Sequence, residues 1–159
     1  MANPFNILIS QLLKAYKLDC SANKLDDSSD VYTFSMGNNL DIHLIGKQQN
    51  YLNIVCFLDI SLENLEKKKL YELLSLNSFC LDHPVFSIGI HQDNKVVLST
   101  RQLLREVDSV ELFKLVEVFT ERADSLQHWL NSDSGTTKKD AREADFIARQ
   151  SRVRGASTL

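Results

Sequence analysis

The segment YLNIVCFLDI, residues 51–60, has the pattern of a β-strand that is largely apolar on both faces. A strand sends alternate side chains to opposite faces. The first face would carry Leu52, Ile54, Cys56 and Leu58. The second would carry Tyr51, Val55 and Phe57, with polar residues at Asn53 and Asp59. Both faces of such a strand need a cover, so the fold must supply one for each face from its own helices or from a partner.

The composition predicts one soluble globular domain. The chain has 159 residues, of which 43% are hydrophobic and 25% charged, and these values suit a single core. No apolar run reaches the roughly 18–20 residues that a membrane span needs. The first residues, MANPFNILISQLLKAYK, lack the basic start and the cleavage site of a secretory signal. We therefore expect a cytoplasmic protein that does not insert into membranes.

The net charge of −3 is unevenly distributed along the chain. Residues 138–159 carry six basic and three acidic side chains, so this tail has a charge of +3 and residues 1–137 have −6. An acidic body argues against nucleic acid as the main partner. The apolar content falls after Ser132, and we expect residues 132–159 to form a flexible basic tail. Within it, residues 140–150 could form a short helix.

Hydrophobic periodicity predicts an α-β-β-β-α-β-β-α order within residues 1–131. The predicted helices are residues 4–18, 62–80 and 109–131, and the predicted strands are residues 31–37, 39–46, 51–60, 85–92 and 95–100. Turn residues at 37–39 and 93–94 indicate hairpins. The predicted fold class is therefore α+β, with a twisted antiparallel sheet packed against helices.

Three residues are suited to start the helices. Asn3 precedes Pro4, Ser61 precedes the second helix, and Asp108 with Glu111 resembles a capping box. In the last helix the residues expected to face the core are Leu112, Leu115, Val116, Phe119, Ala123, Leu126 and Leu130. Gly89 lies inside a predicted strand, which suggests a bulge or a close backbone approach.

The sequence contains no strong catalytic or metal-binding motif. The five glycines form no nucleotide loop, and the four histidines lack metal-ligand spacing. Asp82 and His83 could be an orienting carboxylate and a general base, but a polar loop is the simpler interpretation. Asp124 and His128 are more simply a pair on the helix surface. Asp26, Asp27 and Asp30 lack the glycine and the closing glutamate of a calcium loop. Cys20, Cys56 and Cys80 fit no disulfide or zinc framework. We predict a non-enzyme without catalytic, cofactor or metal residues.

The apolar surface leaves two alternatives open. Helices 4–18 and 109–131 could cover one face of the sheet and helix 62–80 the other, which would give a closed monomer. Alternatively, a twin subunit and an extended client peptide cover what the chain leaves exposed. Soluble monomers rarely expose apolar patches beyond a few hundred Å², so the second alternative predicts a protein-binding function.

The order of elements resembles that of the class I chaperones of type III secretion, the family of the Tir chaperone. Three stretches carry the resemblance: FNILISQLLKAYKLD, VYTFSMGNNLDIHLIG and DNKVVLSTRQLLREVDSVELFKLVEVFTERADSLQHWL. The resemblance implies a bacterial, cytoplasmic homodimer. Its function would be to bind an N-terminal segment of one or more secreted effectors, to keep it extended and to bring it to the export apparatus, whose ATPase would be a second partner.

The resemblance also implies roles for particular residues. The predicted client-binding residues are Leu8, Leu12, Tyr32, Phe34, Ile42 and Leu44. The predicted dimer-interface residues are Leu70, Leu73, Leu74, Phe86 and Ile88. A place in the structural core is the alternative for every one of them. Phe34→Asp is predicted to abolish client binding without dissociating the dimer, if Phe34 lies in a client pocket.

Two other functions compete with effector binding. A regulatory member of such a family would bind a small anti-activator protein and so control transcription of secretion genes. An enzyme would use Asp82 and His83 in a buried cleft. For the basic tail, the alternative to a solvated extension is a docking segment for an acidic partner.

Overall fold

The computed structural model describes residues 3–17, 30–36, 40–46, 50–77 and 84–132. The elements are α1 (Pro4–Ala15), β1 (Val31–Met36), β2 (Leu40–Ile45), β3 (Tyr51–Ser61), α2 (Lys67–Ser75), β4 (Phe86–Ile90), β5 (Lys95–Leu103) and α3 (Ser109–Asn131). Short 3-10 turns precede α2 and α3 at Leu62–Asn64 and Leu104–Glu106. The predicted α-β-β-β-α-β-β-α order and α+β class are confirmed.

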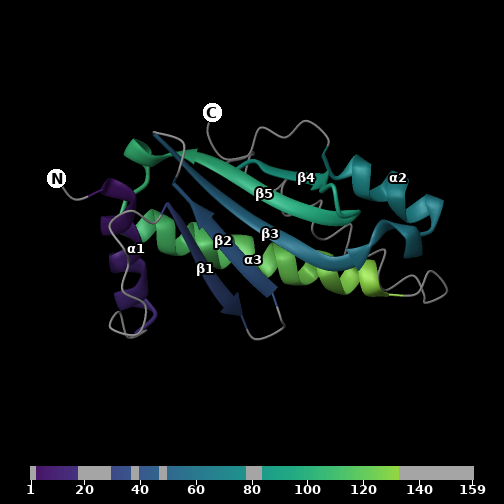
Figure 1. The fold of residues 1–159 in the computed structure, drawn as a ribbon, viewed down its shortest axis with the longest axis horizontal. Coiled ribbons are helices and arrows are strands. Elements are labelled where there is room, and N and C mark those ends of the chain that lie inside the picture. The colour runs from purple at the N-terminus through teal and green to yellow at the C-terminus, as the bar shows by residue number, and fades with distance from the viewer. Residues whose placement is uncertain (1–2, 18–29, 37–39, 47–49, 78–83, 133–159) are drawn as a thin grey trace, which may run out of the picture.

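The strands form one antiparallel sheet in the order β1-β2-β3-β5-β4. β3, which contains residues 51–60, lies in the middle and pairs with β2 and β5. In Figure 1 the sheet faces the reader and α3 runs behind it. α1 stands at the end of α3 near β1, and α2 lies at the opposite end near β4.

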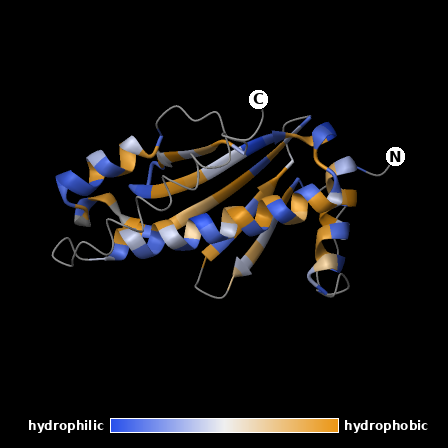
Figure 2. Cartoon of the chain, turned by 180° about the vertical axis from the view of Figure 1, so that it is seen from behind, coloured by the Kyte–Doolittle hydropathy of each residue, from blue (hydrophilic) through white to orange (hydrophobic). Residues whose placement is uncertain are grey.

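The core lies between the sheet and α3. Leu52, Ile54, Cys56 and Leu58 of β3 are all at most 1% exposed. The buried residues of α3 are Leu112, Leu115, Val116, Phe119, Ala123, Leu126 and Leu130, which is the set predicted from the helical period. Figure 2 shows this amphipathic pattern as alternating orange and blue along α3. One face of β3 is therefore covered by the chain's own helices, as expected.

The ends of two helices follow the predicted capping chemistry. The Asn3 side chain accepts a hydrogen bond from the Phe5 N–H at 3.1 Å and starts α1. The Asp108 carboxylate accepts from Val110 and Glu111 N–H, each at 2.8 Å, while the Glu111 side chain accepts from the Asp108 N–H. Such a capping box stabilises a helix start by about 0.5–2 kcal/mol. The α1 helix ends at Ala15, three residues before the predicted end.

The prediction for the second helix was wrong at its start. The segment predicted as helix 62–80 begins with a 3-10 turn, and α2 itself runs only from Lys67 to Ser75. The cap position is Glu66, without a side-chain hydrogen bond, instead of Ser61. The Leu62 N–H donates to the Asn94 carbonyl at 3.0 Å. This bond ties the turn to the β4–β5 hairpin. Residues 78–80 lie outside the described residues.

Lys69 joins α2 to the end of α3. Its ammonium group donates to the carbonyls of Trp129 and Leu130 at 3.2 and 3.1 Å, and also to the carbonyl of Ser132. It lies 5.8 Å from the centroid of the Trp129 ring. The last carbonyls of a helix have no intrahelical donors, and a cation there also interacts favourably with the helix dipole. Lys69 therefore fixes α2 on the α3 side of the sheet.

Gly89 has a different role from the expected one. β4 pairs with β5 without a bulge around it, and a Cβ atom on Gly89 would meet nothing within 4 Å. The close backbone approach occurs instead at Gly46, where a Cβ atom would lie 2.5 Å from a ring atom of Phe5. The glycine that the packing requires is therefore the one at the end of β2, beneath α1.

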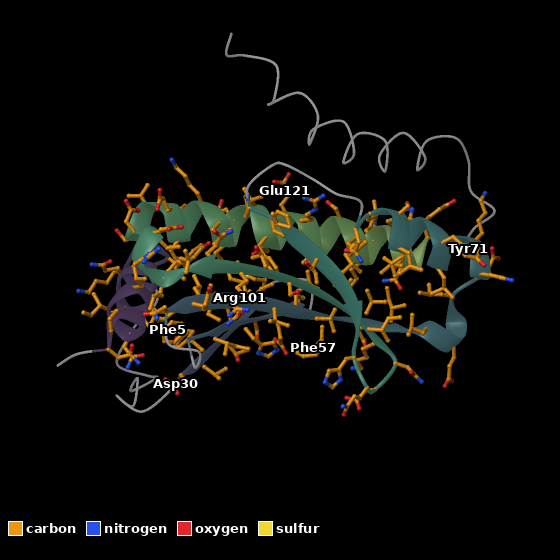
Figure 3. The ribbon with its side chains drawn as sticks, turned by 90° about the horizontal axis from the view of Figure 1, so that it is seen from above. Phe5, Asp30, Phe57, Tyr71, Arg101 and Glu121 are labelled. Carbon is orange, nitrogen blue, oxygen red and sulfur yellow. The ribbon has the colours of Figure 1, made fainter. Side chains whose placement is uncertain are left out.

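No described helix covers the second face of the sheet. A row of paired residues crosses all strands on this face: Thr33, His43, Val55, Ser99 and Ser87. Phe57 is 36% exposed, and Figure 3 shows it with Arg101 on the side away from α3. Within the described residues, α2 therefore does not take the place on the second face that the closed-monomer alternative gave it.

Candidate functional site

The exposed apolar side chains that bear on binding lie at the two ends of the sheet. On α2, on β4 and just before β4, Tyr71, Leu74, Val85 and Ile90 are 64%, 61%, 45% and 57% exposed; we call them the α2–β4 surface. At the other end, Ile7 and Val31 are 47% and 45% exposed on α1 and β1. Figure 1 shows that α2 neighbours β4 and that α1 neighbours β1. Exposed apolar residues that gather on one surface are candidates for contacts with other proteins.

An aromatic cluster of Tyr16, Tyr32, Phe34 and Phe113 joins α1, β1 and α3. The Tyr16 ring centroid lies 5.0 Å from that of Phe113 and 6.3 Å from that of Phe34, and Tyr32 lies 4.9 Å from Phe34. These are favourable separations for tilted aromatic pairs. Tyr16 and Tyr32 are only partly buried against the core. Tyr16 and Tyr32 therefore expose part of their rings near β1, an edge strand of the described sheet.

The Tyr16 hydroxyl is held by α3. It donates to a Glu117 carboxylate oxygen at 3.1 Å. Burial, the hydrogen bond to Glu117 and the negative charge of Glu117 together raise the pKa of Tyr16 to about 12, with burial as the largest cause. The hydroxyl therefore stays protonated and keeps α1 oriented on α3 at neutral pH.

The predicted client-binding residues divide into two groups. Leu8 and Tyr32 are partly buried and reach the surface. Leu12, Ile42, Leu44 and Phe34 are 1%, 0%, 0% and 8% exposed. In the chain alone these four are core residues, the alternative that the sequence left open. Phe34→Asp would place a charge in the core and is expected to unfold the domain, so it does not test client binding.

The predicted dimer-interface residues divide in the same way. Leu74 is exposed, Leu70, Phe86 and Ile88 are half-buried, and Leu73 is 2% exposed within the core. Phe86 packs against Phe119 and lies beneath the Arg122 guanidinium, 4.7 Å from ring centroid to charge. The sequence analysis missed Tyr71, Val85 and Ile90. A signal for Tyr71 existed, because Tyr71 and Leu74 are three residues apart and share a helix face.

The weak chemical patterns gain no support from the structure. Asp26, Asp27, Asp82 and His83 lie outside the described residues, as do Cys20 and Cys80. Among the described residues, no group of three acidic, histidine or cysteine side chains could hold a metal ion. Cys56 is buried as a free thiol, and burial raises its pKa to about 11, with a smaller contribution from Asp41. It therefore acts as a small apolar core residue.

Comparison of the sequence with models of protein families identifies the family of this chain. The model of the Tir chaperone protein (CesT) family matches residues 8–127. The chain belongs to the Tir chaperone family. The match covers every described strand and most of each terminal helix, so this family member is a chaperone of the type III secretion class. A search of the curated proteins gave no match.

Solved structures of similar fold include protein complexes of known chaperones, among them a type III secretion chaperone. The ExoT–SpcS complex from Pseudomonas aeruginosa has 19% identity and a TM-score of 0.58, with 78% of this chain and 97% of that chain covered. The Yersinia pestis type III secretion chaperone SycH, in complex with a fragment of YscM2, has 15% identity, a TM-score of 0.59 and coverage of 77% and 98%. The ExsC–ExsE complex has 15% identity, a TM-score of 0.58 and coverage of 79% and 96%. At these identities the similarity establishes the fold.

The described part of this Tir chaperone family member contains no helix with the length and apolarity of a membrane span.

Proposed function

We propose that this Tir chaperone family member binds an N-terminal segment of one or more secreted effectors, keeps it extended and brings it to the export apparatus. The observation that best supports this proposal is that exposed apolar residues on α1 and β1 lie beside the aromatic cluster, in a chain of the chaperone family. Holding a segment in this way needs binding surface and no catalytic group.

The client site would combine the outer edge of β1 with the side chains beside it. In the described sheet β2 is the strand that pairs with β1, so β1 is an edge strand of that sheet. An extended peptide can add to such an edge through its backbone, while its alternate side chains enter apolar pockets. Val31 and Tyr32 flank this edge, and Ile7 and Leu8 present α1 beside it. These four residues are the proposed client contacts.

The second proposed interface makes the chaperone a homodimer through the α2–β4 surface. Leu70, Leu74, Phe86 and Ile88 would contribute, together with Tyr71, Val85 and Ile90. A two-fold interface brings the same patch of both copies together, so a single exposed apolar surface is sufficient. The ATPase of the secretion apparatus would act on the loaded dimer as a further partner.

A matched pair of substitutions tests the client site. Val31 and Val118 are 45% and 46% exposed, on β1 and α3 respectively. Tagged wild-type, Val31→Asp and Val118→Asp chaperones are purified from the native host, and bound proteins are identified by mass spectrometry. We expect wild type and Val118→Asp to retain the same secreted protein through its N-terminal region. Val31→Asp should lose at least about 90% of it, because a buried unpaired charge at such an interface costs several kcal/mol.

Circular dichroism and thermal unfolding serve as folding controls for both variants. Retention of the effector by Val31→Asp at the wild-type level would contradict the β1 client site. Loss of the effector from both variants would also contradict it, because the effect would not be specific to β1.

The regulatory function is the second candidate, and the similarity to the ExsC–ExsE complex is the observation that favours it. The same purification distinguishes the two. Recovery of a small protein that is not secreted as an effector, together with altered transcription of secretion genes when the chaperone is deleted, would favour the regulatory role. The basic tail is tested separately: deletion of residues 133–159 should leave secretion unchanged if the tail is only a solvated extension.

A further inference from the structure

The outer edge of β4 is occupied by the side chain of Asn77. The Asn77 side-chain amide donates to the Ile88 carbonyl at 2.7 Å, and the Ile88 N–H donates to the Asn77 side-chain carbonyl at 2.7 Å. Ile88 is the central residue of β4 (Phe86–Ile90), which lies at the edge of the described sheet. The groups of Ile88 that would bind a neighbouring strand are therefore already in use.

This pair of bonds imitates strand pairing. Two residues directly opposite each other in an antiparallel sheet exchange both of their N–H···O bonds in alternate pairs. The carbonyl oxygen and the NH2 group of a carboxamide are bonded to the same carbon, so the side chain can accept from the N–H and donate to the C=O of one residue. The bonds of Ile88 point away from β5, and His91, three positions later, donates toward β5 through the Lys95 carbonyl at 2.9 Å. Asn77 thus takes the place of one residue of an added strand.

The same edge is suited to a second copy of this chain. If two β4 strands pair antiparallel around a two-fold axis at Ile88, each Ile88 exchanges both bonds with its counterpart, and Phe86 lies opposite Ile90 of the second copy. This register is self-complementary, as an isologous interface requires. Ile90 and Val85 are 57% and 45% exposed beside the edge, and their burial would favour association.

We propose that Asn77 blocks the outer edge of β4 in the free chain, and that a second copy adds its β4 strand only after Asn77 leaves. The inference rests on the proposed homodimer and specifies how it is regulated. Dimerisation then exchanges the two Asn77 bonds of each copy for strand–strand bonds. The affinity of the dimer is therefore lower than it would be with an unblocked edge. The block also keeps newly made chains from pairing through β4 with unrelated strands.

The test measures the dimer dissociation constant of the full chain by sedimentation equilibrium. Asn77→Ala removes the competing side chain, and the dissociation constant should fall about 5- to 30-fold, because each copy no longer breaks hydrogen bonds to expose Ile88. Ile90→Pro removes an outward N–H while leaving the bonds to β5 in place. It should raise the dissociation constant at least about 10-fold relative to Ile90→Ala, which matches it in the loss of the side chain.

Hydrogen exchange at the Ile88 amide gives an independent readout. In the monomer this amide should exchange more slowly in wild type than in Asn77→Ala, and in the dimer it should be protected in both. Equal dissociation constants for wild type and Asn77→Ala, or for Ile90→Pro and Ile90→Ala, would overturn the inference. A dimer with those equalities would leave the proposed homodimer standing, whereas a monomer at every concentration in all four proteins would overturn both. Effector capture by Val31→Asp and Val118→Asp tests the client function separately.

Discussion

The attachment of α1 to the sheet depends on Gly46, and we predict that Gly46→Ala destabilises the protein. A Cβ atom at this position would lie 2.5, 2.7 and 2.9 Å from three ring atoms of Phe5. Phe5 is 1% exposed, so its ring has no free space into which it can turn. The Gly46 N–H also donates to the Asp30 carbonyl at 2.8 Å, which holds the end of β2 against the start of β1. Neither side of the contact can therefore withdraw easily.

The expected cost follows from the size of this overlap. Overpacking a well-filled core costs about 1–3 kcal/mol, and the rigid ring places Gly46→Ala in the upper half of that range. For a domain of this size each kcal/mol lowers the melting temperature by roughly 3 °C. The free energy of unfolding should therefore fall by about 2–3 kcal/mol, with a drop in Tm of about 6–9 °C.

Gly89→Ala is the matched control, because a Cβ atom there meets nothing within 4 Å. It should leave stability unchanged or raise it by up to about 1 kcal/mol, since alanine has less conformational entropy to lose than glycine. Urea denaturation of both variants, followed by Trp129 fluorescence and by circular dichroism, measures the difference. If the two variants unfold at the same urea concentration, the argument that α1 packs its Phe5 ring on the Gly46 backbone is refuted.

Three further predictions concern single side chains. Lys69→Met should lower the free energy of unfolding by about 1.5–3 kcal/mol in urea denaturation, because the carbonyls at the end of α3 lose a charged donor. The control Lys68→Met removes only an exposed 4.0 Å ion pair with Glu72 and should change the free energy of unfolding by less than about 0.5 kcal/mol. Equal effects of the two substitutions would contradict the anchoring role of Lys69. The pKa of Tyr16 is raised to about 12 in the folded state by burial and by Glu117, so stability should decline as pH rises from about 10 to about 12, and Tyr16→Phe should reduce this decline; an unchanged pH profile would argue against the burial of the hydroxyl. Burial raises the pKa of Cys56 to about 11, so site-resolved mass spectrometry should show alkylation of Cys56 by iodoacetamide only at the rate of unfolding, and rapid labelling of the native protein would contradict its place in the core.

The elements that the sequence predicted well are those with local causes. The last helix was predicted with its start, its end and all of its buried residues, because the capping box and the 3.6-residue period both lie within the segment itself. The β1–β2 hairpin was predicted equally well from apolar alternation. Where local signals agree with the packing, a single sequence is enough.

The elements predicted poorly depend on contacts that are distant in sequence. The 3-10 turn before α2 is bonded to Asn94 through Leu62, and α2 itself is bonded through Lys69 to residues about 60 positions away. Neither contact leaves a periodic pattern. For the same reason alternation placed Ile42 and Leu44 together on one face, but it could not show that α3 covers that face completely. The sequence alone therefore could not distinguish residues proposed to contact a client from residues of the core.

The second face of β3 also illustrates why the binding surfaces lie at the edges of the sheet. Taken alone, Tyr51, Val55 and Phe57 indicated an apolar face that needed a cover. The neighbouring strands add Thr33, His43 and Ser99 in the same row as Val55, and Phe57 lies between the rings of His43 and His91 at 5.6 and 5.2 Å. The assembled face is therefore mixed and can remain in water.

The edges differ from this face in a way that favours protein partners. The outer edge of a sheet carries backbone donors and acceptors that its own strand cannot satisfy. Exposed apolar residues lie on or beside both outer strands of the described sheet: Val31 on β1, and Val85 and Ile90 at β4. Backbone groups supply affinity without regard to sequence, and the flanking apolar side chains supply selectivity. A chaperone that must hold an extended segment at one edge and a twin subunit at the other requires both features. In the proposed assembly the two edges must not accept the same partner, and the hydrogen bonds of the Asn77 carboxamide to Ile88 would prevent this at β4.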